Sequence, residues 1–289
     1  MTTIKPYKNY IPAVCAAVVL YALFALLTFK VAAGVMDSTD FQIEQSVYSL
    51  RSPGLNTLVE MITYCGNTAT IIVVTLLLLA FPRTRVRYGL PVLAADILTT
   101  IIKVIVKNAV ERPRPDKIYF LISQGGFSYP SGHAITSIAV YGILAWLIWF
   151  YHHKKFAESP SGRALAAAAA GATDPNGAPA PAANLPALTM TGKHWAFFII
   201  TACLSVCIGL SRIYVGVHHP TDILGGFLAG SATAILILAA VHHMVMSGAA
   251  AKLPGSAASK AIGAAALSGA AAEAASGESP ATPDEEAAE

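Results

Sequence analysis

The sequence predicts an all-α membrane protein, a bundle of six transmembrane helices. The 289-residue chain is 55% hydrophobic and only 12% charged, and its mean hydropathy is +0.59. A chain of this composition is too apolar and too poor in charged residues to be an ordinary soluble domain. Six segments are also apolar over roughly the 20 residues that a bilayer-crossing helix needs, and three polar clusters interrupt them.

The six predicted spans form one membrane domain, residues 1–248. The first span is longer than the apolar core of a signal peptide and has only a weak cleavage site, so we expect a retained anchor. The fifth span is the shortest. The spans cover residues 11–35, 61–81, 88–106, 134–151, 195–210 and 223–246.

Two segments are low in complexity and rich in alanine, residues 157–188 and residues 249–289, the second of which ends in acidic residues. Neither has enough bulky apolar side chains to offset the entropy lost on ordering. We therefore predict a flexible cytoplasmic loop and a disordered cytoplasmic tail.

The distribution of basic residues predicts the orientation in the membrane. If the N-terminus is cytoplasmic, the larger share of the 19 Lys and Arg residues also falls on that side, as cytoplasmic loops favour. Trp149 and Trp195 stand at span ends, where aromatic belts occur. The sequence therefore predicts a multi-pass protein of the plasma (inner) membrane, with both termini in the cytoplasm.

Charge and cysteine content argue against several partners. The net charge of +3 and the lack of a long basic run argue against nucleic acid as a ligand. All four cysteines lie in apolar stretches, which favours neither a disulfide framework nor a zinc site. The expected partners are the bilayer and a membrane lipid, and we infer no obligate protein partner.

The three polar clusters fall on the outer side in this topology. Each has a plain alternative on its own: interfacial cations flanking a span, a helix cap, or a surface ion pair. Together they combine cations, a helix start and two histidines at one end of the bundle. Their chemically relevant members are Lys107, Arg114, Ser131, Gly132, His133, Arg212, His218 and Asp222.

This combination suits a site that transfers a phosphoryl group. Lys107, Arg114 and Arg212 supply cations for the oxygens that carry charge in the transition state. Ser131 and Gly132 begin a helix, where free backbone N–H groups and the helix dipole favour an anion. These five residues are the predicted phosphate ligands.

The two histidines suit nucleophilic and acid–base roles. Asp222 follows His218 by four residues, a spacing that allows the carboxylate to fix one ring nitrogen while the other attacks. His133 is then free to act as the acid.

The three clusters match a known three-part signature. They read KxxxxxxRP from Lys107 to Pro115, PSGH from Pro130 to His133, and SRxxxxxHxxxD from Ser211 to Asp222. This pattern resembles the type 2 phosphatidic acid phosphatase family, whose bacterial integral members also have six spans. The resemblance implies an all-α core and a phosphohistidine on His218.

The resemblance also implies roles for the other residues. Asp222 would orient the nucleophile, and His133 would protonate the leaving oxygen and later activate water. The family uses no divalent metal or other cofactor, so none is expected here. The implied reaction is hydrolysis of a terminal phosphate from a lipid phosphate or pyrophosphate: undecaprenyl pyrophosphate, phosphatidylglycerol phosphate or phosphatidic acid.

Three alternatives share parts of this signature. A lipid phosphotransferase would share the first chemical step and differ in the acceptor. A vanadate-dependent haloperoxidase would place vanadate at the phosphate position, but those relatives are soluble. A receptor or transporter with a phosphate pocket would be expected to lack a histidine or a clamp residue, and none is missing here.

Two ionisable residues in the third span lie outside the signature. Asp96 and Lys103 share a helix face with Lys107. An ionisable residue at this depth is a functional hypothesis by default. The alternative for Asp96 is a hydrogen bond to Thr99, to Thr100 or to a neighbouring helix.

Overall fold

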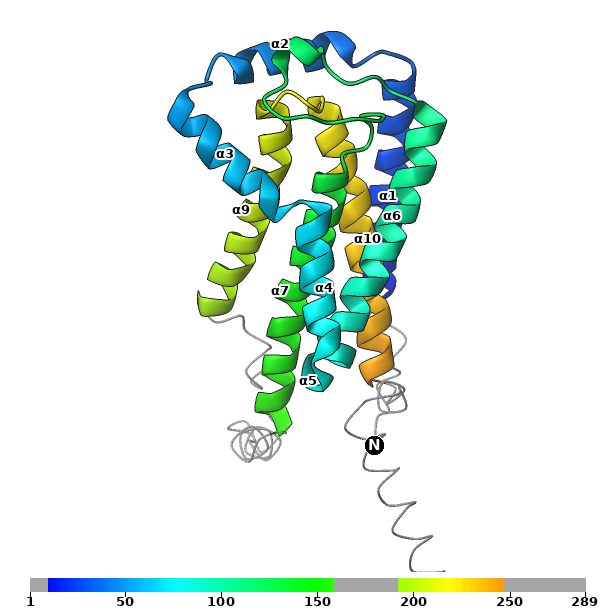
Figure 1. Ribbon diagram of the computed structural model, residues 1–289. Coiled ribbons are helices and arrows are strands. Elements are labelled where there is room, and N and C mark those ends of the chain that lie inside the picture. The colour runs from blue at the N-terminus through cyan, green and yellow to red at the C-terminus, as the bar shows by residue number, and fades with distance from the viewer. Residues whose placement is uncertain (1–9, 159–191, 247–289) are drawn as a thin grey trace, which may run out of the picture.

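The computed structural model describes residues 10–158 and 192–246, and these residues form helices and connecting segments without a β-strand. Five of its helical segments are long and apolar enough to cross a membrane. They lie side by side in a bundle (Figure 1). The main helices in them are α1 (Ile11–Ala32), α6 (Leu90–Val110), α7 (Gly132–Glu158), α9 (Gly192–Tyr214) and α10 (Pro220–Met246), and the segment of α6 begins at Pro82.

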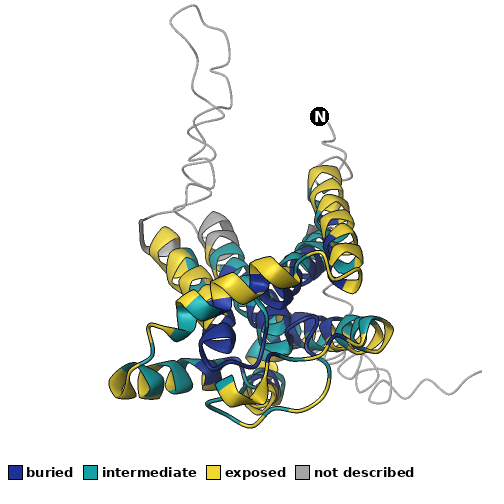
Figure 2. Ribbon diagram, turned by 90° about the horizontal axis from the view of Figure 1, so that it is seen from above, coloured by how far each residue is buried: buried dark blue, intermediate teal, exposed yellow. Residues whose placement is uncertain are grey.

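The bundle is apolar on the outside as well as the inside. Buried residues gather toward the middle of the bundle, and the outward faces of the peripheral helices are exposed (Figure 2). Large apolar side chains such as Phe29, Leu76, Ile105 and Ile200 are among the exposed ones. A surface of this kind suits lipid rather than water, so the chain is an all-α, multi-pass membrane protein, as the sequence predicts.

The second predicted span, residues 61–81, is not one straight helix. The chain forms α3 (Pro53–Cys65) and α4 (Thr68–Ala80), which are bent by 42° at a short break and give a sixth span if counted together. Asn67 caps α4 by accepting a hydrogen bond from the Ala69 amide. A side chain at Gly66 would bring its Cβ within 2.3 Å of Ile208, so close packing against α9 requires the glycine.

A further helix, α2 (Asp37–Tyr48), lies across one end of the bundle (Figure 1). The sequence predicts no element here, because this 12-residue segment is polar. Its two buried residues are both acidic, Asp40 and Glu44, and their four-residue spacing places them on one face. We call this end of the molecule the α2 end.

Helix α6 ends and helix α10 begins at the α2 end. After α6, Glu111 adopts a left-handed conformation with φ of 50°, and its amide donates to the Lys107 carbonyl, a common way to end a helix. Pro220 occupies the first turn of α10, where a missing N–H costs little.

The remaining short helices are α5 (Pro82–Thr84), the π-helical η2 (Arg85–Gly89) and the 3₁₀ helix η3 (Lys117–Tyr119).

Most of the predicted loop (residues 159–188) and the whole predicted tail (residues 249–289) lie outside the described residues.

Candidate active site

The structure brings the predicted site residues to the α2 end. They come from the end of α6 and the segment after it, the start of α7, the end of α9, the turn between α9 and α10, and the start of α10. These parts of the chain are far apart in sequence. Their meeting at one end is the arrangement that the alternating directions of the spans predict.

His218 and Asp222 form the centre of the site. His218 Nδ1 lies 3.1 Å from Asp222 Oδ2, and both side chains are buried. The same carboxylate oxygen accepts from the His219 amide at 2.9 Å, and Oδ1 accepts from Arg112 at 2.9 Å. Asp222 is thus held by three donors, and its position fixes the ring of His218.

The protonation of His218 follows from these contacts. Burial lowers its pKa to about 3, against the raising effect of Asp222, and the charges of Arg114 and Arg212 lower it further. The ring is therefore neutral near pH 7. Because a carboxylate only accepts hydrogen bonds, the proton lies on Nδ1, which leaves a lone pair on Nε2. That atom is 3.3 Å from Arg114 Nη1.

Arg114 and Lys107 organise the loop before α7. Arg114 donates to the carbonyls of Gly126 at 2.9 Å, Gly125 at 3.0 Å and Val217 at 2.6 Å. Lys107 Nζ donates to the carbonyls of Phe127 and Ser128. Both predicted clamp residues thus bind main-chain oxygens around the site, and Arg114 also reaches the nucleophilic nitrogen.

Arg212 and Ser131 each keep one buried polar atom without a partner. Arg212 Nη1 donates to Thr63 at 2.9 Å and Nη2 donates to Gln124 at 2.8 Å, which fixes the guanidinium. Among the described residues, neither Arg212 Nε nor Ser131 Oγ has a hydrogen-bond partner. A buried donor left unpaired costs about 1–3 kcal/mol. Binding of an anion between them would satisfy both.

Gly132 and His133 open α7. The Ser131 amide donates to the Asp222 carbonyl at 3.1 Å, which ties this helix start to the nucleophile's carboxylate residue. The ring of His133 packs beside Gly66, since a Cβ there would lie 3.1 Å from His133 Cδ2. His133 is half-buried. The bend between α3 and α4 therefore lies directly beside the predicted acid.

The residues that support the site were not predicted from the sequence. Arg112 joins Asp222 to Asp40 and Asp37 of α2, and Thr63 and Gln124 hold Arg212. The spacing of the acidic residues in 37–44 was a usable signal, since positions three and four apart share a helix face. No such signal exists for Thr63 and Gln124.

Asp96 has a structural partner. Its Oδ2 accepts from Thr75 of α4 at 2.6 Å, so the expectation of a hydrogen bond to a neighbouring helix is confirmed. Within the described ranges, no group of three or more His, Cys, Asp or Glu residues is placed to hold a metal ion. Metal independence of the reaction remains a prediction for assay.

Comparison with known proteins adds a family match. The profile of the PAP2 superfamily matches residues 86–245, more than half of the chain and all three signature clusters. Phosphatidylglycerophosphatase B of Bacillus subtilis (strain 168) is 26% identical over 213 residues, which are 73% of this chain and 87% of that protein. Undecaprenyl-diphosphatase of Sulfolobus acidocaldarius is 28% identical over 182 residues, 61% of this chain and 66% of that protein.

A solved structure shares the fold. The transmembrane PAP2 type phosphatidylglycerolphosphate phosphatase from Bacillus subtilis aligns with a TM-score of 0.58 at 23% identity, covering 79% of this chain and 96% of that one. At this identity the likeness concerns the arrangement of helices.

Proposed function

This chain belongs to the PAP2 superfamily and is a membrane phosphatase, and we propose that it removes the terminal phosphate of a lipid phosphate or lipid pyrophosphate through a phosphohistidine on His218. One observation carries the proposal. The buried, neutral His218 has its Nδ1–H fixed by Asp222, and its Nε2 lone pair faces Arg114. This is the geometry of an oriented nucleophile beside a cation.

In the first step, His218 Nε2 attacks phosphorus, the P–N bond forms and the bond from phosphorus to the lipid-side oxygen breaks. In the enzyme–substrate complex, the negative charge of the bound phosphate favours the protonated form of His133, which gives its proton to that oxygen. The imidazole of His218 gains positive charge as the bond forms, and Asp222 stabilises it through Nδ1–H. The products of this step are the dephosphorylated lipid and the phosphoenzyme.

In the second step, water replaces the lipid-side oxygen. His133, now neutral, takes a proton from the water as its oxygen attacks phosphorus. The P–N bond breaks, the electron pair returns to His218 Nε2, and inorganic phosphate leaves. His133 ends the cycle protonated, as it began.

The remaining site residues stabilise the charge on the transferred group. Arg212 Nε and Ser131 Oγ are buried and can each donate a hydrogen bond. The Gly132 amide belongs to the first turn of α7, where N–H groups have no partner within the helix. Arg114 Nη1 stands beside Nε2. Lys107 adds a positive charge next to the loop. Fixed donors of this kind, buried from water, are effective at stabilising a phosphoryl transition state.

The position of the site favours a lipid substrate. Lys107 and Arg212 lie near helix ends, so the phosphate would lie near headgroup level and its chain would extend into the hydrocarbon. The two curated relatives are named for phosphatidylglycerophosphate and undecaprenyl diphosphate, which both carry a terminal phosphate on a membrane lipid.

Chain length is the direct test of this substrate class. Lengthening the acyl or prenyl chain of the substrate should raise kcat/KM until added CH₂ groups no longer contact the protein, since each buried CH₂ is worth about 0.8 kcal/mol. The measurement compares short- and long-chain substrates at monomeric concentrations in one detergent. Equal kcat/KM for a soluble sugar phosphate and every long-chain lipid would contradict the lipid proposal.

We also propose that the α2 end faces outward from the cytoplasm and that both termini are cytoplasmic, because the Lys and Arg distribution favours it. A cysteine introduced at Lys117, near the site, should react with an impermeant thiol reagent in intact cells, while one at Lys260 should react only after permeabilisation. The four native cysteines are replaced first, to remove background. Labelling at position 260 but not 117 in intact cells would reverse the orientation.

A further inference from the structure

We propose that α2 is a positioning element of the catalytic centre, in which Asp40 acts through Arg112, and Glu44 through His219, to fix the Asp222 carboxylate behind the nucleophile. The inference rests on the proposed function of His218. The two residues that it adds from α2, Asp40 and Glu44, lie outside the segment matched by the family profile, residues 86–245. Neither of them belongs to the three-part signature.

Asp40 is fully buried and uses both carboxylate oxygens. Oδ1 accepts from the Thr221 amide at 3.0 Å, and Oδ2 accepts from Arg112 Nη2 at 2.7 Å. The Thr221 hydroxyl also donates to Oδ2. Thr221 directly precedes Asp222, so α2 is hydrogen-bonded to the first turn of α10 at the residue next to the catalytic carboxylate.

Arg112 connects the two carboxylates. Its Nη1 donates to Asp222 at 2.9 Å and to the Thr221 hydroxyl at 2.8 Å, while Nη2 donates to Asp40. The guanidinium is buried, and its planar fork fixes the relative position of its partners. Without Asp40, more of the positive charge of Arg112 would act on Asp222 and weaken its hold on His218 Nδ1–H.

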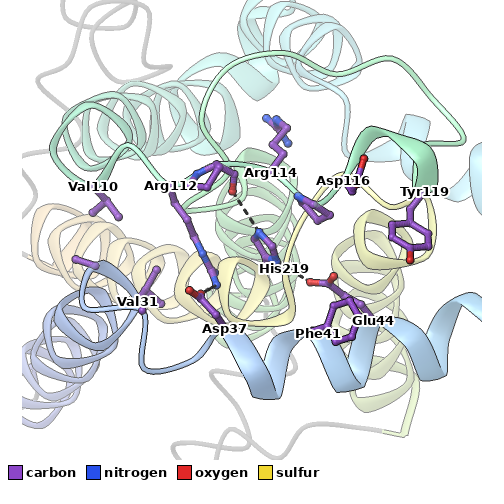
Figure 3. A pocket seen from close by; sticks show the side chains of 14 residues that line it. Val31, Asp37, Phe41, Glu44, Val110, Arg112, Arg114, Asp116, Tyr119 and His219 are labelled. Carbon is purple, nitrogen blue, oxygen red and sulfur yellow. Dashed lines mark hydrogen bonds and ion pairs between the residues drawn. The ribbon is translucent and has the colours of Figure 1, made fainter.

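Glu44 makes a second link one turn further along α2. It lies 2.6 Å from His219 Nδ1, and the Pro113 carbonyl lies 3.2 Å from Nε2. Both ring nitrogens therefore face acceptors, which suits a protonated imidazole. The His219 amide donates to Asp222 Oδ2. In Figure 3, His219 points toward Glu44 while Arg112 points toward Asp37.

The charge of His219 makes this link dependent on pH. Burial alone would lower its pKa, but Glu44 and the negative charge of Asp222 outweigh burial and the opposing charge of Arg112, so the pKa is raised. Asp37, Arg114 and Asp116 line the same cavity of about 420 Å³. The ion pair between protonated His219 and Glu44 is fully formed below the ordinary pKa of histidine. It is lost as pH rises through the raised pKa of His219.

The test compares two aspartates that bind the same nitrogen of Arg112. Asp40→Asn should lower kcat about 10- to 100-fold, the range expected for losing a hydrogen bond to a charged group, and should leave KM within about twofold. Asp37→Asn is the matched control. Asp37 also binds Nη2, at 2.9 Å, but its side chain is 65% exposed, so kcat should change by less than about threefold.

A pH profile separates positioning from mere support of the fold. Glu44→Gln should shift the alkaline fall of kcat to lower pH, because it removes the contact that raises the pKa of His219. This variant also tests the proposal if Asp40→Asn does not fold. An unchanged profile, or equal effects of Asp40→Asn and Asp37→Asn on kcat, would overturn it. A wild-type protein that releases no phosphate would instead refute the proposed function.

A separate observation concerns Lys103 in α6. It lies beside the predicted phosphate ligand Gly132, where an added Cβ would be 3.2 Å from Lys103 Cδ and 3.9 Å from Nζ. It stands one turn before Lys107, deeper in the bundle. Among the described residues, no hydrogen bond or ion pair within 4 Å is found for Lys103, and the opposite charge that acts on it is that of Asp96, two turns earlier in α6. A cation at this depth without a bonded partner is costly unless it has a ligand.

We infer that Lys103 binds the inner, lipid-attached phosphate of a diphosphate substrate, which makes lipid diphosphates the preferred class for the proposed function. When the terminal phosphate is at His218, the inner phosphate lies on the side of the lipid chain, and the chain extends into the bilayer. Lys103 is placed on that side of Gly132. Lys107 and Arg114 are nearer the end of the bundle.

Paired substrates test this role. Lys103→Met should lower kcat/KM for a prenyl diphosphate about tenfold or more relative to the prenyl monophosphate of the same chain length, the loss expected for one charge-assisted contact. Lys30→Met, which removes an exposed cation from α1, is the control and should leave the ratio unchanged. An equal loss on both substrates, or no loss on either, would contradict the inference. Failure of the wild type on both would count against the phosphatase proposal itself.

Discussion

His218→Ala should abolish phosphate release and should form no phosphoenzyme. The variant lacks the Nε2 atom that attacks phosphorus, and the alanine side chain places no nucleophile beside Arg114 instead. We expect a fall in kcat of at least about 10⁴-fold, as for loss of the nucleophile in other covalent mechanisms. The measurements are phosphate release from purified protein and acid-quenched trapping of labelled enzyme.

A matched control comes from the same helix bundle. His242 lies in α10 far from the site, with ring contacts to Trp146 and Phe150, so His242→Ala should retain most activity. Detection of labelled phosphoenzyme in His218→Ala would contradict the assignment of the nucleophile.

His133→Ala should fail in a different way. The nucleophile remains, but the leaving oxygen receives no proton and water is not activated, so steady-state kcat should fall about 10²- to 10⁴-fold. With a good leaving group such as para-nitrophenolate, the first step needs little acid assistance. The variant should therefore release a burst of para-nitrophenol and then accumulate a slowly hydrolysed phosphoenzyme.

Burst kinetics with a good and a poor leaving group check this expectation. The burst should appear for the para-nitrophenyl ester and be absent for an alkyl phosphate. Absence of a burst with both substrates in folded protein would show that His133 is needed before the P–N bond forms.

The transmembrane helices were predictable from the sequence because the bilayer demands long apolar segments. The break at Gly66 and Asn67 was not. At the break, Gly66 lies in close contact with Ile208 of α9, which is far away in sequence. The helix α2 was also missed, since burial of Asp40 and Glu44 depends on Arg112 and His219, and a polar segment without these partners would stay in water.

The chemistry of the site was predictable to a similar extent. Fixed spacings marked His218, Asp222 and the PSGH segment, and the structure joins them through short contacts. The contacts that hold these residues come from other helices, as in the bonds of Arg212 to Thr63 and Gln124. Such contacts depend on how the helices pack, which no local pattern records.

Phosphate release by the detergent-purified protein, with EDTA throughout, tests the central claim most directly. The substrates are undecaprenyl pyrophosphate, phosphatidylglycerol phosphate, phosphatidic acid and lysophosphatidic acid, with His218→Ala as the blank. The account predicts release from at least one lipid, unaffected by EDTA and absent in His218→Ala. Release from none of the lipids, release that stops in EDTA and returns with added magnesium, or equal release by His218→Ala would contradict it.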